Sequence, residues 1–310
     1  MAEPCLASER CGADEPVLTG ERPSARNPRL VICPTPIGNL GDMPPRALAA
    51  LREADVVCAE DTRVTGKLLA ALGVSGKRME RLDEAMIATK ADKVLSWVEE
   101  GQVVAFCSDA GMPGVSDPGQ RLIAAAYERD VAVEVLPGPT AVATAYVASG
   151  FTSTQFMFCG FFPRKAAEAK TLLTSYAPIP GVLLFYESPR RIVAALQVVA
   201  EVLPLRKVAV CRELTKLHEE VLRGTAAEVG ETLQAREAAE GVKGEIVLVI
   251  DAPGDEEAQV AHDQAVCGAE ERARELLAAG SMTKKDVVRS LRQEFGLSRN
   301  EAYGLVMSLG

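Results

Sequence analysis

The first half of the chain alternates short apolar runs with longer stretches in which apolar residues recur at the helical period. The apolar runs predict strands over 30–33, 55–59, 103–107 and 132–136. The longer stretches predict helices over 44–53, 64–72, 88–99, 118–129 and 139–149. Strands that alternate with helices are typical of βαβ crossovers, so residues 29–150 predict an N-terminal α/β domain with a mostly parallel sheet.

A second unit with the same kind of pattern follows. Its apolar runs predict strands over 155–161, 182–186, 207–211 and 245–250, and its helical stretches lie at 165–175 and 189–202. The run 219–229 predicts a strand followed by a helix, and 207–223 has the length of a hairpin. Residues 151–251 therefore predict a second α/β domain with a mixed sheet.

The two ends of the chain differ from these domains in composition. Residues 1–28 are rich in Pro, Glu, Arg, Ser and Ala and lack the apolar core of a signal peptide, so we expect a flexible tail. Residues 252–267 predict an acidic linker. Residues 268–310 predict three short amphipathic helices with Ser or Thr before the second and third and Gly after the first and second, which favours a small domain resembling a helix-turn-helix.

The overall composition narrows the class of protein. The 310 residues are 48% apolar and 25% charged, which suits two α/β domains and a smaller third one. No apolar stretch reaches the roughly 20 residues of a membrane span, so we expect no membrane contact. The eight cysteines form no C-x-x-C pair and only two histidines are present, which favours a reduced, cytoplasmic protein without a metal site.

The charge is distributed unevenly. A net charge of −9 is unfavourable for binding nucleic acid, because phosphate contacts supply most of that affinity. Residues 251–271 nevertheless contain seven acidic and no basic side chains, whereas residues 281–303 contain five basic and three acidic ones. Much of the acidity therefore lies outside the C-terminal helices.

Three loops rich in Gly and Pro follow predicted strands of the first domain. They are "PTPIGNLGD" (34–42), "SDAGMPGVSDPG" (108–119) and "LPGPTA" (136–141). Glycine lets a backbone approach a ligand closely, proline fixes the shape of a loop, and Asp and Ser supply oriented polar groups. The alternative is an ordinary loop in which Ser116 or Asp117 caps a helix. Two such loops at adjacent strand ends favour a ligand crevice.

Charged motifs follow other predicted strands. They are "AEDTR" (59–63), "FYESPRR" (185–191), "RELTK" (212–216) and "KGE" (243–245). Such groups at strand ends either orient a polar substrate and transfer protons or form structural ion pairs. The chain contains neither G-x-G-x-x-G nor G-x-x-x-x-G-K-[ST], so the usual dinucleotide-binding and P-loop functions are disfavoured.

These seven motifs occur in the order and spacing of the tetrapyrrole methylase superfamily. The loop "PTPIGNLGD", in place of a GxGPGD-type loop, and "AEDTR" make the chain similar to the ribosomal RNA methyltransferase branch. The resemblance covers about residues 29–250. It implies a two-domain class III methyltransferase fold with S-adenosylmethionine in the cleft between the domains. It also implies a homodimer that methylates the ribose 2′-hydroxyl of a decoding-region cytidine in 16S ribosomal RNA of the small subunit.

The resemblance also implies roles for individual residues. Cofactor binding is expected at loop residues that follow strands: Pro36, Gly38, Ser108, Asp109, Gly111, Ser116, Gly138, Pro139 and Tyr186. The hypothesis for the acceptor side comprises Glu60, Asp61, Arg63, Glu187, Arg212, Glu213 and Lys216. A lysine with a lowered pKa or a carboxylate with a raised pKa would take the hydroxyl proton, and the sequence leaves that choice open.

Basic side chains are expected to contact the RNA. They are Arg164, Lys165, Arg190, Arg191, Lys284, Lys285, Arg289 and Arg292. The alternative for the C-terminal helices is that they stabilise a dimer.

The chain departs from the family pattern at three places. "LDEAMIATK" (82–90) stands where a His/Asn-rich patch is usual, Met112 replaces a common Thr, and Arg190 replaces a common His. Two other functions therefore stay open. One is a small-molecule methyltransferase that acts on a tetrapyrrole, and the other is an inactive protein that binds RNA or the ribosomal subunit.

Overall fold

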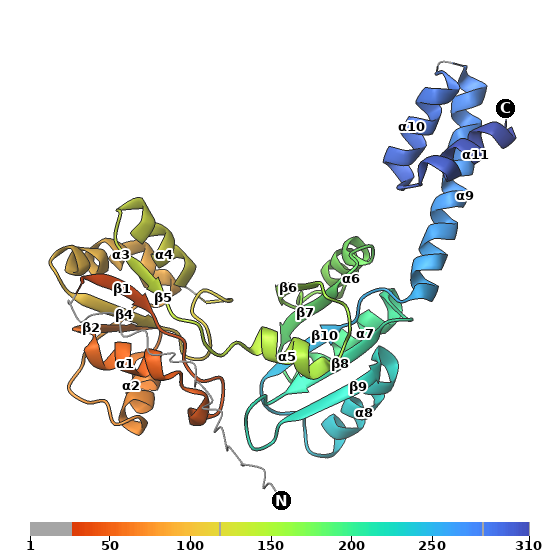
Figure 1. The fold of residues 1–310 in the computed structure, drawn as a ribbon. Helices are drawn as coiled ribbons and strands as arrows, with labels where there is room; N and C mark the ends of the chain where they lie inside the picture. Colours follow the sequence, from red (N-terminus) through yellow and green to blue (C-terminus); the bar gives the residue numbers. More distant parts are fainter. Residues whose placement is uncertain (1–26, 118, 281, 310) are drawn as a thin grey trace, which may run out of the picture.

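The computed structural model describes residues 27–117, 119–280 and 282–309, which form two α/β domains and a helical arm (Figure 1). All but the last two residues of the predicted flexible tail, 1–28, lie outside the described residues. The predicted two-domain α/β fold with additional C-terminal helices is confirmed.

The first sheet is entirely parallel, with the strand order β3-β2-β4-β1-β5. Its strands are β1 (Arg29–Ile32), β2 (Val56–Ala59), β3 (Arg78–Arg81), β4 (Val103–Cys107) and β5 (Val133–Val135). The helices that follow them are α1 (Pro45–Glu53), α2 (Thr62–Ala71), α3 (Glu84–Glu99), α4 (Gly119–Glu128) and α5 (Ala141–Ser149). A short 3-10 turn, η1 (Leu40–Asp42), precedes α1. The loops after β1, β4 and β5 therefore meet at one edge of the sheet.

The sequence predicts four of these five strands and misses β3. That strand reads Arg-Met-Glu-Arg and lies at the edge of the sheet, so it has no apolar run to reveal it. The third helix begins at Glu84 rather than at 88. Its start is fixed by Asp83, whose side chain accepts a hydrogen bond from the backbone of Met86 at 3.0 Å. The segment 82–90, where the family pattern is lost, is thus the beginning of α3.

The second sheet is mixed, as predicted, with the order β6-β7-β10-β8-β9. Its strands are β6 (Phe156–Phe161), β7 (Val182–Glu187), β8 (Lys207–Arg212), β9 (Glu220–Thr225) and β10 (Ile246–Ile250). The pair β6–β7 is parallel and the other pairs are antiparallel, including the predicted hairpin of β8 and β9. The helices α6 (Ala166–Tyr176), α7 (Ile192–Val202) and α8 (Ala226–Ala239) accompany this sheet.

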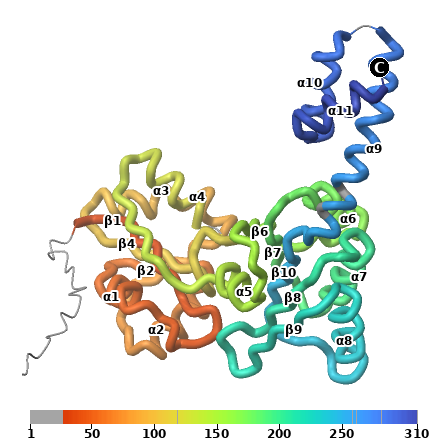
Figure 2. Tube along the Cα trace, turned by 45° about the vertical axis from the view of Figure 1, so that its right-hand side comes forward, coloured from red at the N-terminus to blue at the C-terminus, as the bar shows by residue number. Residues whose placement is uncertain are grey.

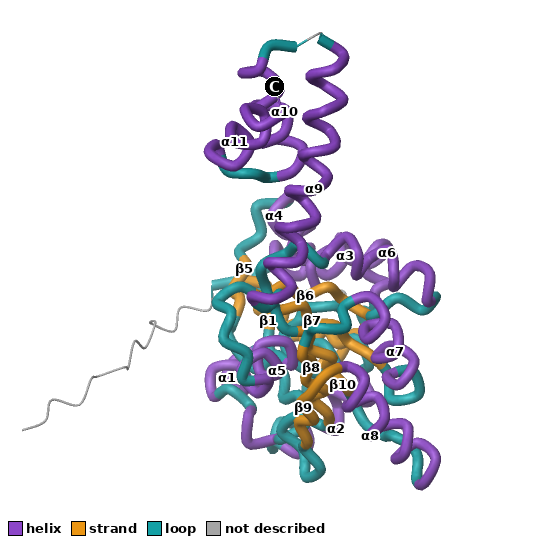
Figure 3. The backbone as a smooth tube through the Cα atoms, turned by 90° about the vertical axis from the view of Figure 1, so that its right-hand side faces the viewer, coloured by secondary structure: helices purple, strands orange, loops and turns teal. Residues whose placement is uncertain are grey.

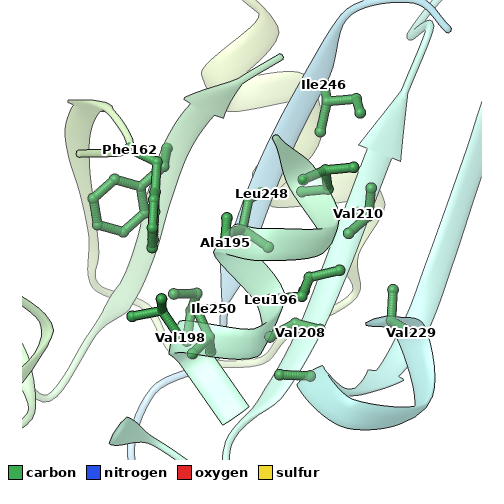
Figure 4. Close-up of a cluster of buried hydrophobic side chains, with 14 of the residues drawn as sticks. Phe162, Ala195, Leu196, Val198, Val208, Val210, Val229, Ile246, Leu248 and Ile250 are labelled. Atoms are coloured by element: carbon green, nitrogen blue, oxygen red, sulfur yellow. The ribbon is translucent and has the colours of Figure 1, made fainter. Parts of the chain in front are cut away.

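The two faces of the second sheet are covered by helices from different parts of the chain. Figure 4 shows side chains of α7 packed among those of β8 and β10, with Phe162 in the same cluster. The opposite face is covered by α5, whose Val142 and Ala145 are buried against β7, β8 and β10. The sequence predicts this helix as the end of the first domain, but its apolar contacts lie in the second. Ile37, from the loop after β1, belongs to the same buried cluster.

The C-terminal helices form a small bundle at the end of a long helix. They are α9 (Asp255–Ala279), α10 (Lys284–Phe295) and α11 (Arg299–Leu309). Most of the segment 252–267, which the sequence predicts as a linker, is helical, because α9 is continuous for 25 residues from Asp255. Asp255, Glu256 and Glu257 occupy its first turn, where negative charge stabilises a helix. Figures 1 and 2 show α10 and α11 away from both sheets, and Figure 3 shows the strands enclosed by other helices.

A buried ion pair fastens the base of α9 to the second domain. Arg206 is 1% exposed, and its Nε donates to both carboxylate oxygens of Glu257 at 3.0 Å. The Nη2 atom of Arg206 also donates to the carbonyl of Ala177 at the end of α6. A buried guanidinium needs such partners because burying a bare charge is costly. The direction of α9 is therefore tied to the core of the second domain.

We expect Glu257→Ala to lower the free energy of unfolding of the second domain by about 3 kcal/mol, because it leaves Arg206 buried without its carboxylate. Urea unfolding followed by circular dichroism measures the loss. Glu256→Ala is the matched control, since this exposed residue lies in the same helical turn. Equal losses in both variants would show that the ion pair is not the cause.

Candidate active site

A cleft of approximately 950 Å³ lies between the two domains. Its lining comes from the segments after β1, β2, β4 and β5 on one side. On the other side it comes from the segments after β6 and β7, from α7, from the end of β8 and from the start of β10. A cleft of this size is typical of sites for cofactors and small substrates. The predicted crevice at the carboxyl ends of the first sheet is thus present, and the second domain closes it.

The loop after β4 is tied to the loop after β1. Thr35 and Gly111 exchange two backbone hydrogen bonds, of 2.9 and 3.1 Å, and Thr35 Oγ1 donates to the carbonyl of Ser108 at 3.3 Å. Gly111 has a φ of +80°, which is unfavourable for other residues. Asp117 accepts from the backbone of Gly114 and, at 3.2 Å, from that of Gly119, so it holds the loop together. The polar groups of this loop are therefore fixed before any ligand binds.

Three carboxylates, those of Glu60, Asp109 and Asp117, stand on the first-domain side of the cleft. Glu60 lines it, and Asp109 lies next to Glu60, with its backbone N–H 3.5 Å from the Glu60 carboxylate. Burial raises the pKa of the Glu60 and Asp109 carboxyl groups, and the charge of Asp109 raises the pKa of Glu60 further. This wall therefore favours a positively charged or proton-donating ligand group.

Asp61 and Arg63 have a structural role at the start of α2. Asp61 accepts from the Arg63 backbone at 2.8 Å and forms an ion pair with the Arg63 guanidinium at 2.6 Å. These hydrogen bonds hold the pKa of Asp61 well below its usual range. Neither residue lines the cleft, so the alternative of a structural ion pair describes both.

On the second-domain side, Glu187 at the end of β7 is 5% exposed. Its Oε1 accepts from the backbone of Ser188 at 2.6 Å. Its Oε2 lies 2.9 Å from Nη2 of Arg191, but that nitrogen donates to the carbonyls of Phe162 and Pro163. Within the described residues Oε2 accepts no hydrogen bond. Burial also raises the pKa of this carboxyl group. Oε2 is buried against the Arg191 guanidinium, so an ion pair between Glu187 and Arg191 forms part of the lining of the cleft.

Lys216 is held between two carboxylates. Its Nζ donates to Glu213 at 2.7 Å and to Glu245 at 3.0 Å. Burial lowers the pKa of Lys216, but these hydrogen bonds outweigh it and leave the pKa above its ordinary value. A lysine that accepts a proton needs the opposite shift. The direction of this shift favours a carboxylate over Lys216 as the proton acceptor.

Gly38 makes a close contact between the two domains. A Cβ atom at this position would lie 2.4 Å from Cγ of Lys216 and 2.9 Å from Oγ1 of Thr215. Thr215 and Glu213 have positive φ values of 66° and 52°, so the loop after β8 has a strained shape. The sequence predicts that Gly38 lets the cofactor approach the backbone. In the structure, the side chain that approaches Gly38 is that of Lys216.

The predicted site residues differ in whether they line the cleft. Those that line the cleft are Glu60, Ser108, Gly111, Ser116, Arg164, Tyr186, Glu187 and Arg191. Those in the same loops or at their ends but outside the lining are Pro36, Gly38, Asp61, Arg63, Asp109, Gly138, Pro139, Lys165 and Arg190. Arg212 and Glu213 line a second pocket of approximately 500 Å³, and Lys216 lines neither. Lys284, Lys285, Arg289 and Arg292 lie on α10, which Figure 1 shows away from both sheets, and none of them lines the cleft. Their roles stay predictions.

Sequence reasoning missed several residues of the cleft. Ile37, Met112, Val115, Thr140 and Phe161 line it as well. Phe161 ends the apolar run 155–161, which predicts a buried strand, so the pattern does not reveal that its side chain faces the cleft. The one available signal was Gly160, since a glycine inside a strand often marks a bulge.

The fold and the cleft together define a class III methyltransferase, in which two α/β domains enclose the cofactor site. Solved structures support this fold at low sequence identity. Diphthine synthase superposes with a TM-score of 0.55 at 15% identity, covering 72% of this chain and 89% of that one. The methyltransferase CobJ superposes with a TM-score of 0.54 at 18% identity, covering 73% and 99%.

The chain belongs to the tetrapyrrole (corrin/porphyrin) methylase family, whose sequence model matches residues 29–230. Its curated relatives include "Ribosomal RNA small subunit methyltransferase I" of Micromonospora olivasterospora, 39% identical over 92% of this chain and 88% of the relative. The protein of the same name from Synechocystis is 37% identical over 90% and 98%. The resemblance noted in the sequence is confirmed, and so is S-adenosylmethionine as the cofactor.

Among the described residues, no helix is long and apolar enough to cross a membrane. The same residues include no group of three or more His, Cys, Asp or Glu side chains suited to holding a metal ion.

We expect Gly38→Ala to weaken binding of S-adenosylmethionine about tenfold, because the added methyl group pushes the loop after β8 away from the first domain at a cost of about 1–3 kcal/mol. Isothermal titration calorimetry measures the affinity. Gly41→Ala is the control in the same turn, since its Cβ would meet only the Asn39 side chain, at 3.2 Å. Wild-type affinity in Gly38→Ala would contradict the importance of this contact.

Proposed function

We propose that the protein transfers a methyl group from S-adenosylmethionine to the ribose 2′-hydroxyl of a decoding-region cytidine in 16S ribosomal RNA. The observation that carries the proposal is the similarity, over about nine-tenths of the chain, to proteins named ribosomal RNA small subunit methyltransferase I. The cleft supports it, because the volume of approximately 950 Å³ has room for a cofactor and one nucleotide.

The residues of the cleft fit the cofactor. S-adenosylmethionine has a positively charged sulfonium, which makes its methyl group electrophilic. Glu60 and Glu187 place carboxylates on the two sides of the cleft, and that of Glu187 is ion-paired with Arg191. The fixed loop 108–117 and Tyr186 supply backbone and ring surface. We assign cofactor binding to the residues expected from the sequence, with Ser108, Gly111, Ser116 and Tyr186 in the lining itself.

The chain then has to align the acceptor and take its proton. Alignment of two reactants alone contributes roughly 7–11 kcal/mol to lowering a barrier, so a strong base is not required. A carboxylate whose pKa is raised toward neutrality is better suited to accept a proton than an ordinary one. Glu60 and Glu187 meet that condition and line the cleft. We therefore assign proton acceptance to one of these two carboxylates, and a role in holding the domains together to Lys216.

Contact with RNA is assigned to two basic regions. Arg164 and Arg190 are exposed at the ends of β6 and β7, and neither has an ion-pair partner among the described residues. On α10, Lys285, Arg289 and Arg292 share one face, opposite the buried Val287 and Leu291. We further propose a homodimer that acts in the cytoplasm, as the family resemblance implies.

The test uses purified protein, labelled S-adenosylmethionine and small ribosomal subunits that lack 2′-O-methylation. Label on the ribose of a single decoding-region cytidine is the expected result. Cofactor binding without label on RNA would favour the small-molecule methyltransferase. Absence of cofactor binding would favour the inactive protein that binds RNA or the subunit.

A second prediction concerns the basic face of α10. Replacing Lys285, Arg289 and Arg292 together by Gln should weaken binding to the small subunit and reduce the slope of log affinity against log salt by about 2, since about 0.7 is lost per phosphate contact. Filter binding at several salt concentrations measures this. The control replaces Arg272 and Arg274 of α9, whose guanidinium groups already pair with glutamates. An unchanged slope in the triple variant would rule out the RNA role of α10.

A further inference from the structure

The strand β6 contains a bulge just before it reaches the cleft. Phe158 is opposite Leu184 of β7 and Phe161 is opposite Tyr186, so three steps on β6 match two on β7. Gly160, with a φ of +74°, absorbs the extra residue. Because side chains alternate between the faces of a strand, one extra residue exchanges the faces of everything after it.

The bulge decides which of two adjacent phenylalanines is buried. Met157 and Cys159 point to the core beneath α6 and α7, so a regular strand would send Phe161 there too. Instead Phe162 occupies that core, 3% exposed, with its ring 5.2 Å from that of Phe185 (Figure 4). Phe161 is turned to the cleft, where it remains 66% exposed.

The position of Phe161 leaves a ring face available. Its only ring contact among the described residues is with Tyr186, at 5.6 Å between centroids in an edge-to-face arrangement. A bulge that turns a large aromatic side chain out of the core and into a cleft places its ring where a bound ligand can cover it. The contact with Tyr186 holds one edge of the ring and fixes its orientation.

The charges around Phe161 indicate what the ligand is. Arg164 follows it by three residues, lines the cleft, and has no ion-pair partner within the described part of the chain. Among the acidic side chains of the cleft, Glu60 belongs to the other domain, and Glu187 is ion-paired with Arg191. An exposed aromatic ring beside an unpaired arginine is the combination that binds single-stranded nucleic acid, by stacking on a base and contacting the phosphate.

We infer that Phe161 stacks on the base of the nucleotide that is methylated, while Arg164 contacts an adjacent phosphate. This inference rests on the proposed function and deepens it, because it states how one ribose is presented to the cleft. A base must leave its neighbours before its ribose can enter a narrow site, and an aromatic surface compensates for the lost stacking. Phe161 is thus a substrate-positioning residue.

The test measures kcat/KM for small ribosomal subunits and, separately, the affinity for S-adenosylmethionine. Phe161→Ala should lower kcat/KM by about 5- to 150-fold, the usual effect of removing one stacking side chain. Its affinity for the cofactor should not change. Phe161→Trp should retain activity and Phe161→Leu should not, since leucine keeps apolar bulk without a ring. Phe156→Ala is the matched control, because Phe156 is 48% exposed on the same strand and lies outside the cleft.

The remaining outcomes overturn the inference in distinguishable ways. Wild-type protein that places no label on RNA overturns the proposed function together with this substrate assignment. If the wild type labels RNA and Phe161→Ala does so equally well, only the stacking role fails. A loss of cofactor affinity in Phe161→Ala would assign the ring to the cofactor. A change of oligomeric state in that variant, measured by light scattering, would assign it to a contact between two copies of the chain.

Discussion

The cleft depends on one contact, in which the loop after β1 lies against the second domain. Ile37 is buried with residues of β7, β8 and β10, and Gly38 lets Lys216 approach to a distance that no other residue would allow. Lys216 is fixed in turn by Glu213 and Glu245. Together with Val115 of the loop after β4, which packs against the same cluster, this contact sets the separation of the two walls of the cleft. Methyl transfer requires a defined separation, because the donor and acceptor must be aligned closely.

This contact explains why the motifs of the second domain contain charged residues. "RELTK" and "KGE" lie at strand ends and contain both charges, which makes them look catalytic. Within these motifs Lys216 forms ion pairs with Glu213 and Glu245. Gly244 leaves room for the Glu213 side chain, because a Cβ atom at position 244 would lie 2.4 Å from Cγ of Glu213. The charged residues that remain free to meet a ligand are those whose neighbours leave an atom unused. Glu60 is the clearest of these, since it lines the cleft and forms no ion pair among the described residues.

The sequence predicts whatever depends on local apolar periodicity. The strands β1, β2 and β4 are apolar runs and are found where expected, and the alternation with helices predicts the parallel sheet. It misses β3, whose charged residues suit an edge, and it misplaces α5, which packs on a sheet whose strands come later in the chain. The partner of Gly38 lies 178 positions away, and no local pattern encodes such a contact. The exposure of Phe161 is hidden for a related reason, because one bulge at Gly160 reverses the faces of the strand.

A net charge of −9 is compatible with an RNA substrate because the charges are separated in space. The acidic residues of 255–257 stabilise the first turn of α9, and one of them neutralises the buried Arg206. Glu60 belongs to the wall that suits a sulfonium. Basic side chains without an ion-pair partner among the described residues include Lys284, Lys285 and Arg292 on α10 and Arg164 and Arg190 at the ends of β6 and β7. Since charges farther apart than about 10 Å are largely screened at physiological salt, RNA that approaches these surfaces responds to their local charge more than to the total.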